Sequence, residues 1–249
     1  MWLWGGIKCD SCNTKSFKMK KKIFLISGGS SKIFQDLIQK NYFNNSNIVA
    51  IYNSSKNLFK TKNIKYLKID YSKDFKLGEI EKLIQNYQKI IFINFAAKKN
   101  DKIILDIDCN DFLKSLKINT LSYFKICKFI LPIMIKNKWG RIINISSTGG
   151  ERGDVGTAVY TSSKLASNGI TSIISKEFAR FGITSNTIKL GNFNTGMFLS
   201  LNANKKKKIL NDIPSKKTGK ISNIYKAISF LVKSEYSNNA ILNIDGGYR

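Results

Sequence analysis

The chain has 249 residues, 43% of them hydrophobic, and a formal net charge of +26, which suits one α/β domain with a buried core. It contains no histidine, which excludes Ser–His–Asp hydrolysis and histidine-ligated metal sites, so proton transfer must use Tyr, Lys, Asp, Glu or Ser. Only four of the 42 basic residues are arginines, the residue that base and phosphate recognition favours, so we expect no nucleic-acid partner.

The first 18 residues are expected to form an extension outside the fold. The start MWLWGGIKCDSC has no basic leader and is unlike a signal peptide. A second methionine, Met19, directly precedes KKKIFLISGG, so we expect the domain to cover residues 19–249. Cys9 and Cys12 have CxxC spacing without a matching second pair, so we expect no metal site. No apolar stretch approaches the roughly 20 residues of a membrane span, which favours a cytoplasmic protein without a membrane partner.

Apolar runs of strand length then alternate with longer periodic segments. The predicted strands are residues 23–26, 48–52, 64–69, 90–95, 141–145, 183–188 and 240–244. The predicted helices are residues 31–42, 75–87, 111–136, 157–181 and 222–232. Near-continuous Ile-rich strands are typical of a parallel sheet covered on both faces. The predicted fold is therefore a single-domain, Rossmann-like, doubly wound sheet of about seven strands, whose ligands bind beyond the carboxyl ends of the strands.

The first strand is followed by the glycine turn SGGSSKIF, residues 27–34. Glycines let backbone amides approach a pyrophosphate, and the helix that follows adds the positive end of its dipole. The same residues are also ordinary turn formers, so this turn alone leaves both interpretations open.

Polar or small residues follow the next strands as well. Asp70 and Tyr71 follow the third strand, and Asn94 and Ala96 lie at the end of the fourth. Small residues there let a flat group lie against the backbone, but close packing of strand and helix explains them equally well.

The fifth strand leads into RIINISSTGG and then VYTSSKLA. Tyr160 and Lys164 are four residues apart, which places them on one face of a helix. A tyrosine of pKa near 10 is a poor acid–base catalyst unless a cation stabilises its phenolate, as Lys164 can. An exposed aromatic–lysine pair is the alternative.

Read together, these segments resemble the short-chain dehydrogenase/reductase family, in particular its β-ketoacyl carrier-protein reductase type. The glycine turn, Asn94-x-Ala, Asn119, Ile-Ser-Ser and Tyr-x-x-x-Lys follow in one order, with 28 residues from Asn119 to Ser147 and 13 from Ser147 to Tyr160. The resemblance covers residues 20–249, through FGITSNTIKLGNFNTGM and the closing ILNIDGG.

The resemblance implies an NAD(P)H-dependent oxidoreductase that interconverts a carbonyl and a secondary alcohol by hydride transfer. Tyr160 would be the general acid, and Ser147 would hydrogen-bond the substrate oxygen. Lys164 would lower the pKa of Tyr160 and hold the nicotinamide ribose. Asn119 would interrupt its helix and hold a water that relays protons to Lys164.

The resemblance also implies a cofactor site. Asn94 would support the ribose region, Asp70 would face the adenine amino group, and Thr195 would lie near the nicotinamide carboxamide. The implied cofactor-binding residues are Ser27, Gly28, Ser30, Ser31, Lys32, Ile33, Asn53, Asp70, Tyr71, Asn94, Ala96, Tyr160, Lys164, Gly191 and Thr195.

NADP(H) is favoured over NAD(H), which remains possible. NAD-specific relatives place an acid at the end of the second strand, where this chain reads YNSSK from Tyr52 to Lys56. Nothing there would repel a 2′-phosphate, and Lys56 or Lys32 could attract one.

The chain departs from the family pattern in the glycine turn. Lys32 and Phe34 replace the second and third glycines, so we expect a different backbone path at Lys32 and crowding between helix and sheet at Phe34. Leu190 replaces a usual proline, and Asn239 a common glycine. A relative that has lost cofactor binding and serves as a non-catalytic subunit is therefore the alternative.

The resemblance implies a small-molecule or carrier-bound carbonyl substrate. Residues 195–215 mix apolar side chains with lysines, which suits an acidic or phosphopantetheine-bearing substrate, a nucleotide-linked sugar, or a plain lysine bias. We interpret residues 205–208 as a solvated helix face. The resemblance further implies a homodimer or homotetramer through the helices that carry Asn119 and Tyr160, and the apolar residues 123–135 are compatible with such burial.

Overall fold

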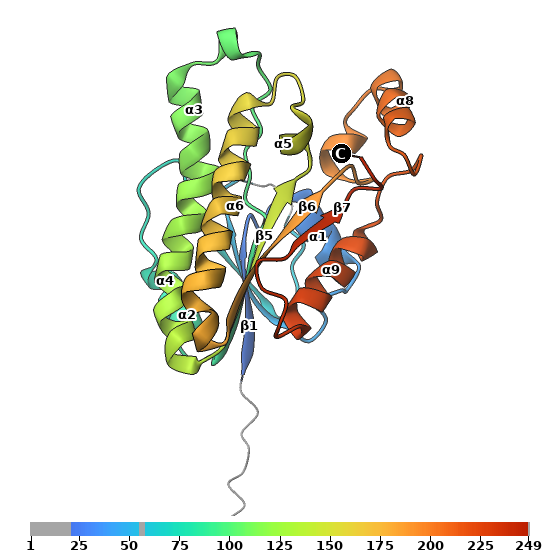
Figure 1. Cartoon of the computed structure of the whole chain (residues 1–249). Coiled ribbons are helices and arrows are strands. Elements are labelled where there is room, and N and C mark those ends of the chain that lie inside the picture. Colours follow the sequence, from blue (N-terminus) through green and yellow to red (C-terminus); the bar gives the residue numbers. More distant parts are fainter. Residues whose placement is uncertain (1–20, 55–57, 249) are drawn as a thin grey trace, which may run out of the picture.

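One parallel sheet organises the molecule. A computed structural model describes residues 21–54 and 58–248, and in this part of the chain seven strands pair in the order β3-β2-β1-β4-β5-β6-β7 (Figure 1). The strands are β1 (Lys22–Ser27), β2 (Asn47–Tyr52), β3 (Ile64–Lys68), β4 (Lys89–Asn94), β5 (Gly140–Ser147), β6 (Ile183–Leu190) and β7 (Ile241–Ile244). The strand order reverses between β1 and β4, which opens a crevice at the carboxyl ends of these two strands. The predicted doubly wound fold is confirmed.

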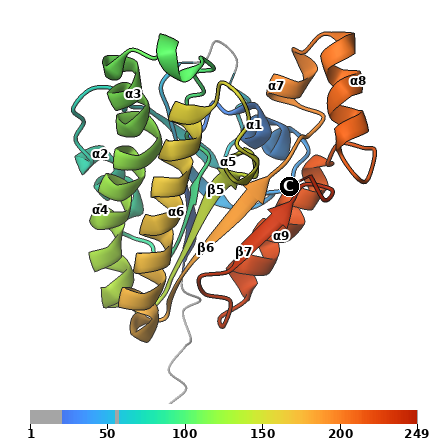
Figure 2. The same cartoon turned by 45° about the horizontal axis from the view of Figure 1, so that its top comes forward.

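Helices cover both faces of the sheet (Figures 1 and 2). One face carries α1 (Lys32–Gln39) and α9 (Ile221–Lys233), and the other carries α2 (Gly78–Ile84), α4 (Ser122–Asn137) and α6 (Ala158–Phe178). Successive β1 residues alternate between the two cores: Phe24 and Ile26 face α1 and α9, while Ile23 and Leu25 face the other layer. This two-sided burial explains why the strands read as continuous apolar runs.

The predicted helix 111–136 is one helical run with an interruption. It consists of α3 (Cys109–Leu116), a π-helical segment at Lys117–Leu121, and α4. Asn119 lies inside the π-helical segment, so the expected interruption at this residue is confirmed. Such a bulge is frequent at functional sites.

Several short elements were not predicted from the sequence. They are a 3₁₀ turn at Ile104–Asp106, α5 (Gly149–Arg152), α7 (Gly196–Leu199) and α8 (Ala203–Asp212). These elements are short and bury few side chains, so the sequence shows no long apolar repeat that would predict them. No described side chain of α8 is buried, which confirms that residues 205–208 lie on a solvated helix face. The helix predicted at residues 75–87 is shorter, because α2 begins only after Leu77.

The expectation about membrane-spanning length needs one correction. Residues Cys109–Asn137 form a helical run of 29 residues whose best window has a mean hydropathy of 1.4, enough to cross a membrane by length and composition. The same composition suits a core helix, because α4 buries Tyr123, Ile126 and Ile130 against the sheet. The run is therefore weak support for a span.

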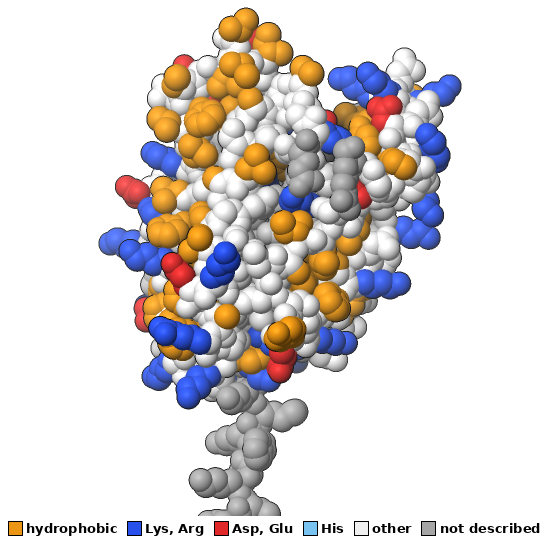
Figure 3. Space-filling view, in the orientation of Figure 1, with side chains coloured by type: hydrophobic (Ala, Val, Ile, Leu, Met, Phe, Trp, Pro, Cys, Tyr) orange, Lys and Arg blue, Asp and Glu red, His pale blue; other side chains and the backbone are white. Residues whose placement is uncertain are grey.

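The basic side chains are spread over the surface. On the face seen in Figure 3 they occur around α8 and along the lower rim rather than in one stripe, which agrees with a compositional bias towards lysine. The predicted extension, residues 1–18, and Cys9 and Cys12 within it lie outside the described residues.

Candidate active site

A cavity of about 260 Å³ lies at the carboxyl ends of the central strands. It is lined by the start of α1, the ends of β4, β5 and β6, the first part of α6, and α7. Its lining residues are Ser31, Lys32, Ile33, Phe95, Ala97, Ile145, Ser146, Ser147, Tyr160, Lys164, Leu190, Gly191, Asn192, Phe193, Thr195, Gly196 and Phe198. Ser147, Tyr160 and Lys164 thus meet at one place, as the order of strand ends predicts. Five other predicted site residues line the same cavity: Ser31, Lys32, Ile33, Gly191 and Thr195.

The glycine turn forms a cradle against the end of β4. Gly28 has a φ of +77°, and a Cβ built on it would lie 2.5 Å from the backbone nitrogen of Ala96. Only glycine fits that position. Ser31 is the N-cap of α1, and its Oγ accepts a hydrogen bond from the Phe34 N–H. The remaining N–H groups of this first turn have no partner within the helix, so the cradle fits an anionic diphosphate.

Phe34 does not crowd the helix against the sheet, contrary to the expectation from the sequence. Its ring is fully buried in the core, 6.0 Å from the Phe95 ring and 6.4 Å from the Phe43 ring between centroids. The aromatic neighbours form a pocket for it, so the missing glycine is replaced by apolar packing.

Lys32 pairs with a neighbour on its own helix. Its Nζ lies 2.8 Å from Oδ1 of Asp36, one turn further along α1. The other carboxylate oxygen of Asp36 accepts a hydrogen bond from the Thr195 hydroxyl. Lys32 and Thr195 both line the cavity, whereas Asp36, which contacts both of them, does not.

Tyr160 and Ser147 form the polar pair at the centre of the cavity. Both side chains line the cavity, and Ser147 Oγ accepts a hydrogen bond from the Gly149 N–H at 3.1 Å. Burial raises the pKa of Tyr160, and the effect of Ser147, which lowers it, only partly opposes this. The phenol is thus protonated at neutral pH and able to donate a proton.

Lys164 lies one helical turn after Tyr160 and is buried. Its Nζ donates to the backbone oxygens of Ile145 at 2.8 Å and Ala96 at 3.4 Å, and lies 6.0 Å from the centroid of the Tyr160 ring. Burial lowers the pKa of Lys164 to about 8. The sequence predicted that Lys164 lowers the pKa of Tyr160, but in this structure the pKa is raised because desolvation outweighs other effects.

Asn119 connects the site to the loop after β4. Its Oδ1 accepts from Lys98 N at 2.7 Å, and its Nδ2 donates to Lys98 O at 3.0 Å and Ser163 Oγ at 2.9 Å. Ser163 Oγ in turn donates to Tyr160 O at 2.7 Å. Asn119 therefore fixes the backbone of α6 next to Tyr160. Its predicted water relay stays a prediction.

Some predicted cofactor residues are structural neighbours of the cavity and not part of its lining. The hydroxyls of Ser27 and Tyr71 are 2.9 Å apart and buried, and burial raises the pKa of Tyr71. Asn94 donates to Asn144 Oδ1 at 3.2 Å, and its own Oδ1 is buried with no hydrogen-bond partner in the described part of the chain. Ala96 packs beneath Gly28.

Three further predicted residues follow the carboxyl ends of β1, β2 and β3, outside the cavity lining. Asp70 accepts from the backbone and the hydroxyl of Ser72 at 2.9 and 2.7 Å, and these hydrogen bonds lower its pKa. Asn53 is exposed at the end of β2, and Ser30 is half-buried in the glycine turn. Lys56 lies outside the described residues.

Other functional groups were missed from the sequence. The carbonyls that hold Lys164 carry no side-chain signal, and Ser163 looked like one serine among several. The Lys32–Asp36 pair could have been found, because a lysine and an aspartate four residues apart meet on one helix face.

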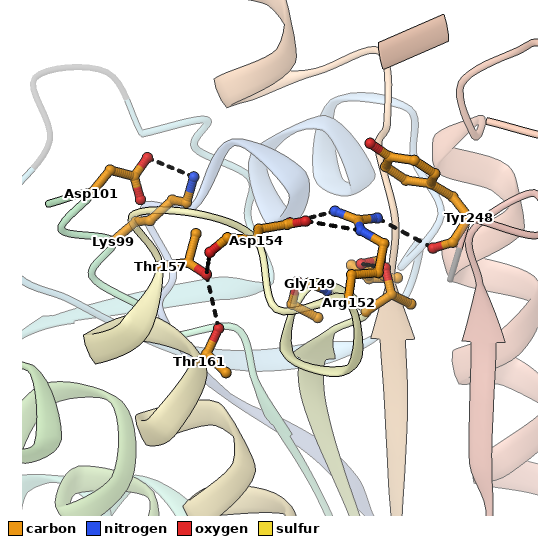
Figure 4. Close-up of polar contacts among 11 residues, drawn as sticks. Lys99, Asp101, Gly149, Arg152, Asp154, Thr157, Thr161 and Tyr248 are labelled. Carbon is orange, nitrogen blue, oxygen red and sulfur yellow. Dashed lines mark hydrogen bonds and ion pairs between the residues drawn. The ribbon is translucent and has the colours of Figure 1, made fainter. Parts of the chain in front are cut away.

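A second missed group is a set of polar contacts around Arg152, in the segment between β5 and α6 (Figure 4). The Arg152 guanidinium pairs with both oxygens of the Asp154 carboxylate, donates to the Tyr248 carbonyl at 3.2 Å, and lies 3.7 Å from the centre of the Tyr248 ring. Thr157 Oγ1 donates to Asp154 O at 2.7 Å. These contacts join the loop after β5 to the end of the chain, next to Ser147.

Comparison with known proteins places this geometry among known enzymes. The family model described as short chain dehydrogenase matches residues 22–206. A 3-oxoacyl-[acyl-carrier-protein] reductase FabG of Buchnera aphidicola subsp. Baizongia pistaciae is 29% identical over 92% of this chain and 98% of its own length. An acetoacetyl-CoA reductase of Allochromatium vinosum is 33% identical over 63% of this chain and 65% of its own.

A solved structure has the same fold. It is titled "ElxO with NADP Bound", is 26% identical in sequence, and superposes with a TM-score of 0.81 over 92% of this chain and 99% of its own.

Proposed function

The chain belongs to the short chain dehydrogenase family and is an oxidoreductase that uses a nicotinamide cofactor, and from this premise we propose that it reduces a 3-oxoacyl thioester with NADPH. One observation carries the proposal: Ser147, Tyr160 and Lys164 line one cavity together with Ser31, Lys32 and Ile33 of the glycine turn. The proposed acid (Tyr160), the proposed hydrogen-bond donor to the substrate oxygen (Ser147) and the turn that would hold the diphosphate thus lie next to the same cavity.

The bound cofactor supplies the hydride, and the chain supplies the proton and the positioning. We propose that Ser147 and Tyr160 both hydrogen-bond the substrate carbonyl oxygen, and that Tyr160 donates its proton to that oxygen as negative charge develops. The Gly149 N–H holds Ser147 Oγ from behind. Lys164, held by two backbone carbonyls, would contact the ribose hydroxyls and return a proton to Tyr160.

The cradle and the end of β2 support NADPH in particular. The Gly28 turn leaves room for a diphosphate, which both nicotinamide dinucleotides carry. The discriminating position is the end of β2, where Asn53 is exposed and no acid is present to repel a 2′-phosphate. The solved structure titled with NADP bound agrees with this choice.

The substrate class rests on the named relatives. Two of them are named for 3-oxoacyl and acetoacetyl thioesters, which share a ketone two carbons from a thioester carbonyl. We propose that a carrier-bound thioester of this kind is the substrate here. Exposed apolar side chains at Ile103, Ile104, Leu105 and Val155 lie on two loops joined by the hydrogen bond from Lys102 N to Gly156 O. They would contact an acyl chain that leaves the cavity.

Cofactor binding is the first test. Titration with NADPH and NADH, followed by nicotinamide fluorescence, is expected to give tighter binding of NADPH. Consumption of NADPH is then measured with acetoacetyl-CoA, an acetoacetyl carrier protein and a nucleotide-linked keto sugar. Absence of NADPH binding up to millimolar concentration would instead support a non-catalytic subunit.

The assigned role of Tyr160 gives a sharper prediction. Tyr160→Phe removes the donated proton and is expected to lower kcat by about two to four orders of magnitude. The NADPH dissociation constant should stay within about threefold of the original value, because the ring remains. Retained turnover would refute the assignment of Tyr160 as the acid.

We further propose that residues 19–249 act as one cytoplasmic domain and assemble as a homodimer or homotetramer. An apolar groove of about 430 Å³ between α4 and α6 supports the assembly. It includes Phe124, Leu131, Ile170 and Ile173, on the two helices expected to meet a second copy.

A further inference from the structure

Asp36 connects two segments that are 159 residues apart in sequence. It lies on α1, the helix that follows the glycine turn, and Thr195 directly precedes α7 and lines the cavity. One oxygen of Asp36 pairs with Lys32 and the other accepts the Thr195 hydroxyl. The Asp36 side chain is 14% exposed and Thr195 only 4%, so water competes little for this hydrogen bond.

The direction of this hydrogen bond determines what Thr195 can offer to a ligand. A hydroxyl has one proton and two lone pairs, whereas a carboxylate oxygen only accepts. Because the proton of Thr195 is donated to Asp36, its oxygen can act only as an acceptor towards the cavity. A ligand group next to it must therefore be a donor, such as an amide N–H₂.

We propose that Asp36 is a positioning residue that makes Thr195 an acceptor for the carboxamide N–H₂ of the nicotinamide. This inference rests on the proposed function, in which Thr195 lies near that carboxamide. Asp36 itself does not line the cavity, so it acts through Thr195.

Lys32 completes the arrangement. An aspartate beside a diphosphate cradle would repel the phosphates, and the ammonium group 2.8 Å from Asp36 offsets that charge. The stem of Lys32 passes over Gly196, where a Cβ would lie 3.2 Å from the Lys32 Cβ. The lysine that replaces a glycine of the family turn is thus the counter-ion of Asp36.

The test compares two ligands that differ at one group. NADP⁺ carries the carboxamide, and its 3-acetylpyridine analogue carries a methyl ketone without N–H. Calorimetry gives the dissociation constant of each, and their ratio cancels any change in phosphate attraction because both ligands carry the same phosphates. The original protein is expected to prefer NADP⁺ by about fivefold, the effect of one neutral hydrogen bond.

The decisive variant is Asp36→Asn. Lys32 can only donate, so it would hold the amide oxygen and turn the N–H₂ towards Thr195. Thr195 then accepts from residue 36 and has its proton available for the ligand. The preference for NADP⁺ over the 3-acetylpyridine analogue should therefore fall to about one or below, because the acetyl oxygen of the analogue can accept the proton that Thr195 now offers.

Matched variants separate this role from packing. Thr195→Val removes the hydroxyl and should bring the ratio to about one, while Thr195→Ser keeps the hydroxyl and should keep the preference. Asp74→Ala removes an exposed carboxylate elsewhere and should leave both constants unchanged. If NADP⁺ binds and Asp36→Asn keeps the fivefold ratio, the inference is wrong. If the original protein does not bind NADP⁺ at all, the proposed function fails and the inference falls with it.

Discussion

Burial sets the protonation of the two titratable side chains nearest the proposed chemistry. The pKa of Tyr160 is raised, so its phenol is protonated and suited to act as an acid. The pKa of Lys164 is lowered to about 8, so its ammonium group titrates just above neutral pH. A pKa close to the working pH is what proton return to Tyr160 requires.

Lys164 should make stability depend on pH in a recognisable way. Its pKa is lower in the folded chain than in the unfolded one. Below pH 8 the buried side chain is charged, which destabilises the folded state by the full desolvation cost. Between about pH 8 and 10.5 the folded state loses this proton first, and the free energy of unfolding therefore rises with pH. The shift from 10.5 to about 8 corresponds to about 3 kcal/mol.

The measurement compares the chain with Lys164→Met. Chemical unfolding at pH 7 and pH 10 should show the original protein gaining about 2 to 3 kcal/mol relative to the variant, slightly less than the full shift because pH 10 still lies below the unfolded-state pKa of 10.5. Tyrosines and the other lysines titrate in both proteins, so the comparison cancels them. If the free energy of unfolding changed with pH in the same way in both proteins, the lowered pKa of Lys164 would be contradicted.

The loop that contains α5 is held by side-chain contacts that a single substitution can remove. Arg152 ties it to Tyr248 and Asp154, and Asp154 is held by Thr157 at the start of α6 (Figure 4). A Cβ on Gly149 would lie 3.0 Å from the Asp154 carboxylate and 3.4 Å from Ser147 Oγ. The ion pair therefore supports the backbone that orients Ser147.

Arg152→Ala should release this loop. Arg152 does not line the described cavity, so NADPH binding should be unchanged, while the KM of the carbonyl substrate should rise about tenfold through loss of charged hydrogen bonds. Steady-state kinetics and NADPH titration measure the two effects separately. Arg180→Ala, which removes an arginine that contacts Phe181 far from the site, is the control. Equal effects of the two substitutions would contradict a local role for Arg152.

At the scale of the whole molecule, the open apolar groove between α4 and α6 points to assembly. Phe124 and Ile173 on its rim are 45% and 55% exposed, although both are large apolar side chains. Covering such a surface with a second copy removes apolar area from water at about 25 cal/mol per Å². The proposed homodimer or homotetramer would bury this groove.

Ile173→Glu should break the assembly, because a carboxylate would be buried in the apolar contact. Sedimentation velocity is expected to show an oligomer for the original chain and a monomer for the variant. Tyr236→Glu changes a fully exposed apolar residue outside the groove and should leave the oligomer intact. An oligomer that survives Ile173→Glu would place the interface elsewhere.

The sequence alone determined the sheet, the strand ends that meet at the site, and the order of Asn119, Ser147, Tyr160 and Lys164. Those features depend on hydrophobic periodicity and on the spacing of residues, both of which can be read directly from the sequence. It could not determine how Phe34 packs, which way Thr195 donates, or that burial raises the pKa of Tyr160. These depend on neighbours that are distant in sequence. Lys32, which looked like damage to the glycine turn, is explained only by Asp36 and Thr195 in the folded chain.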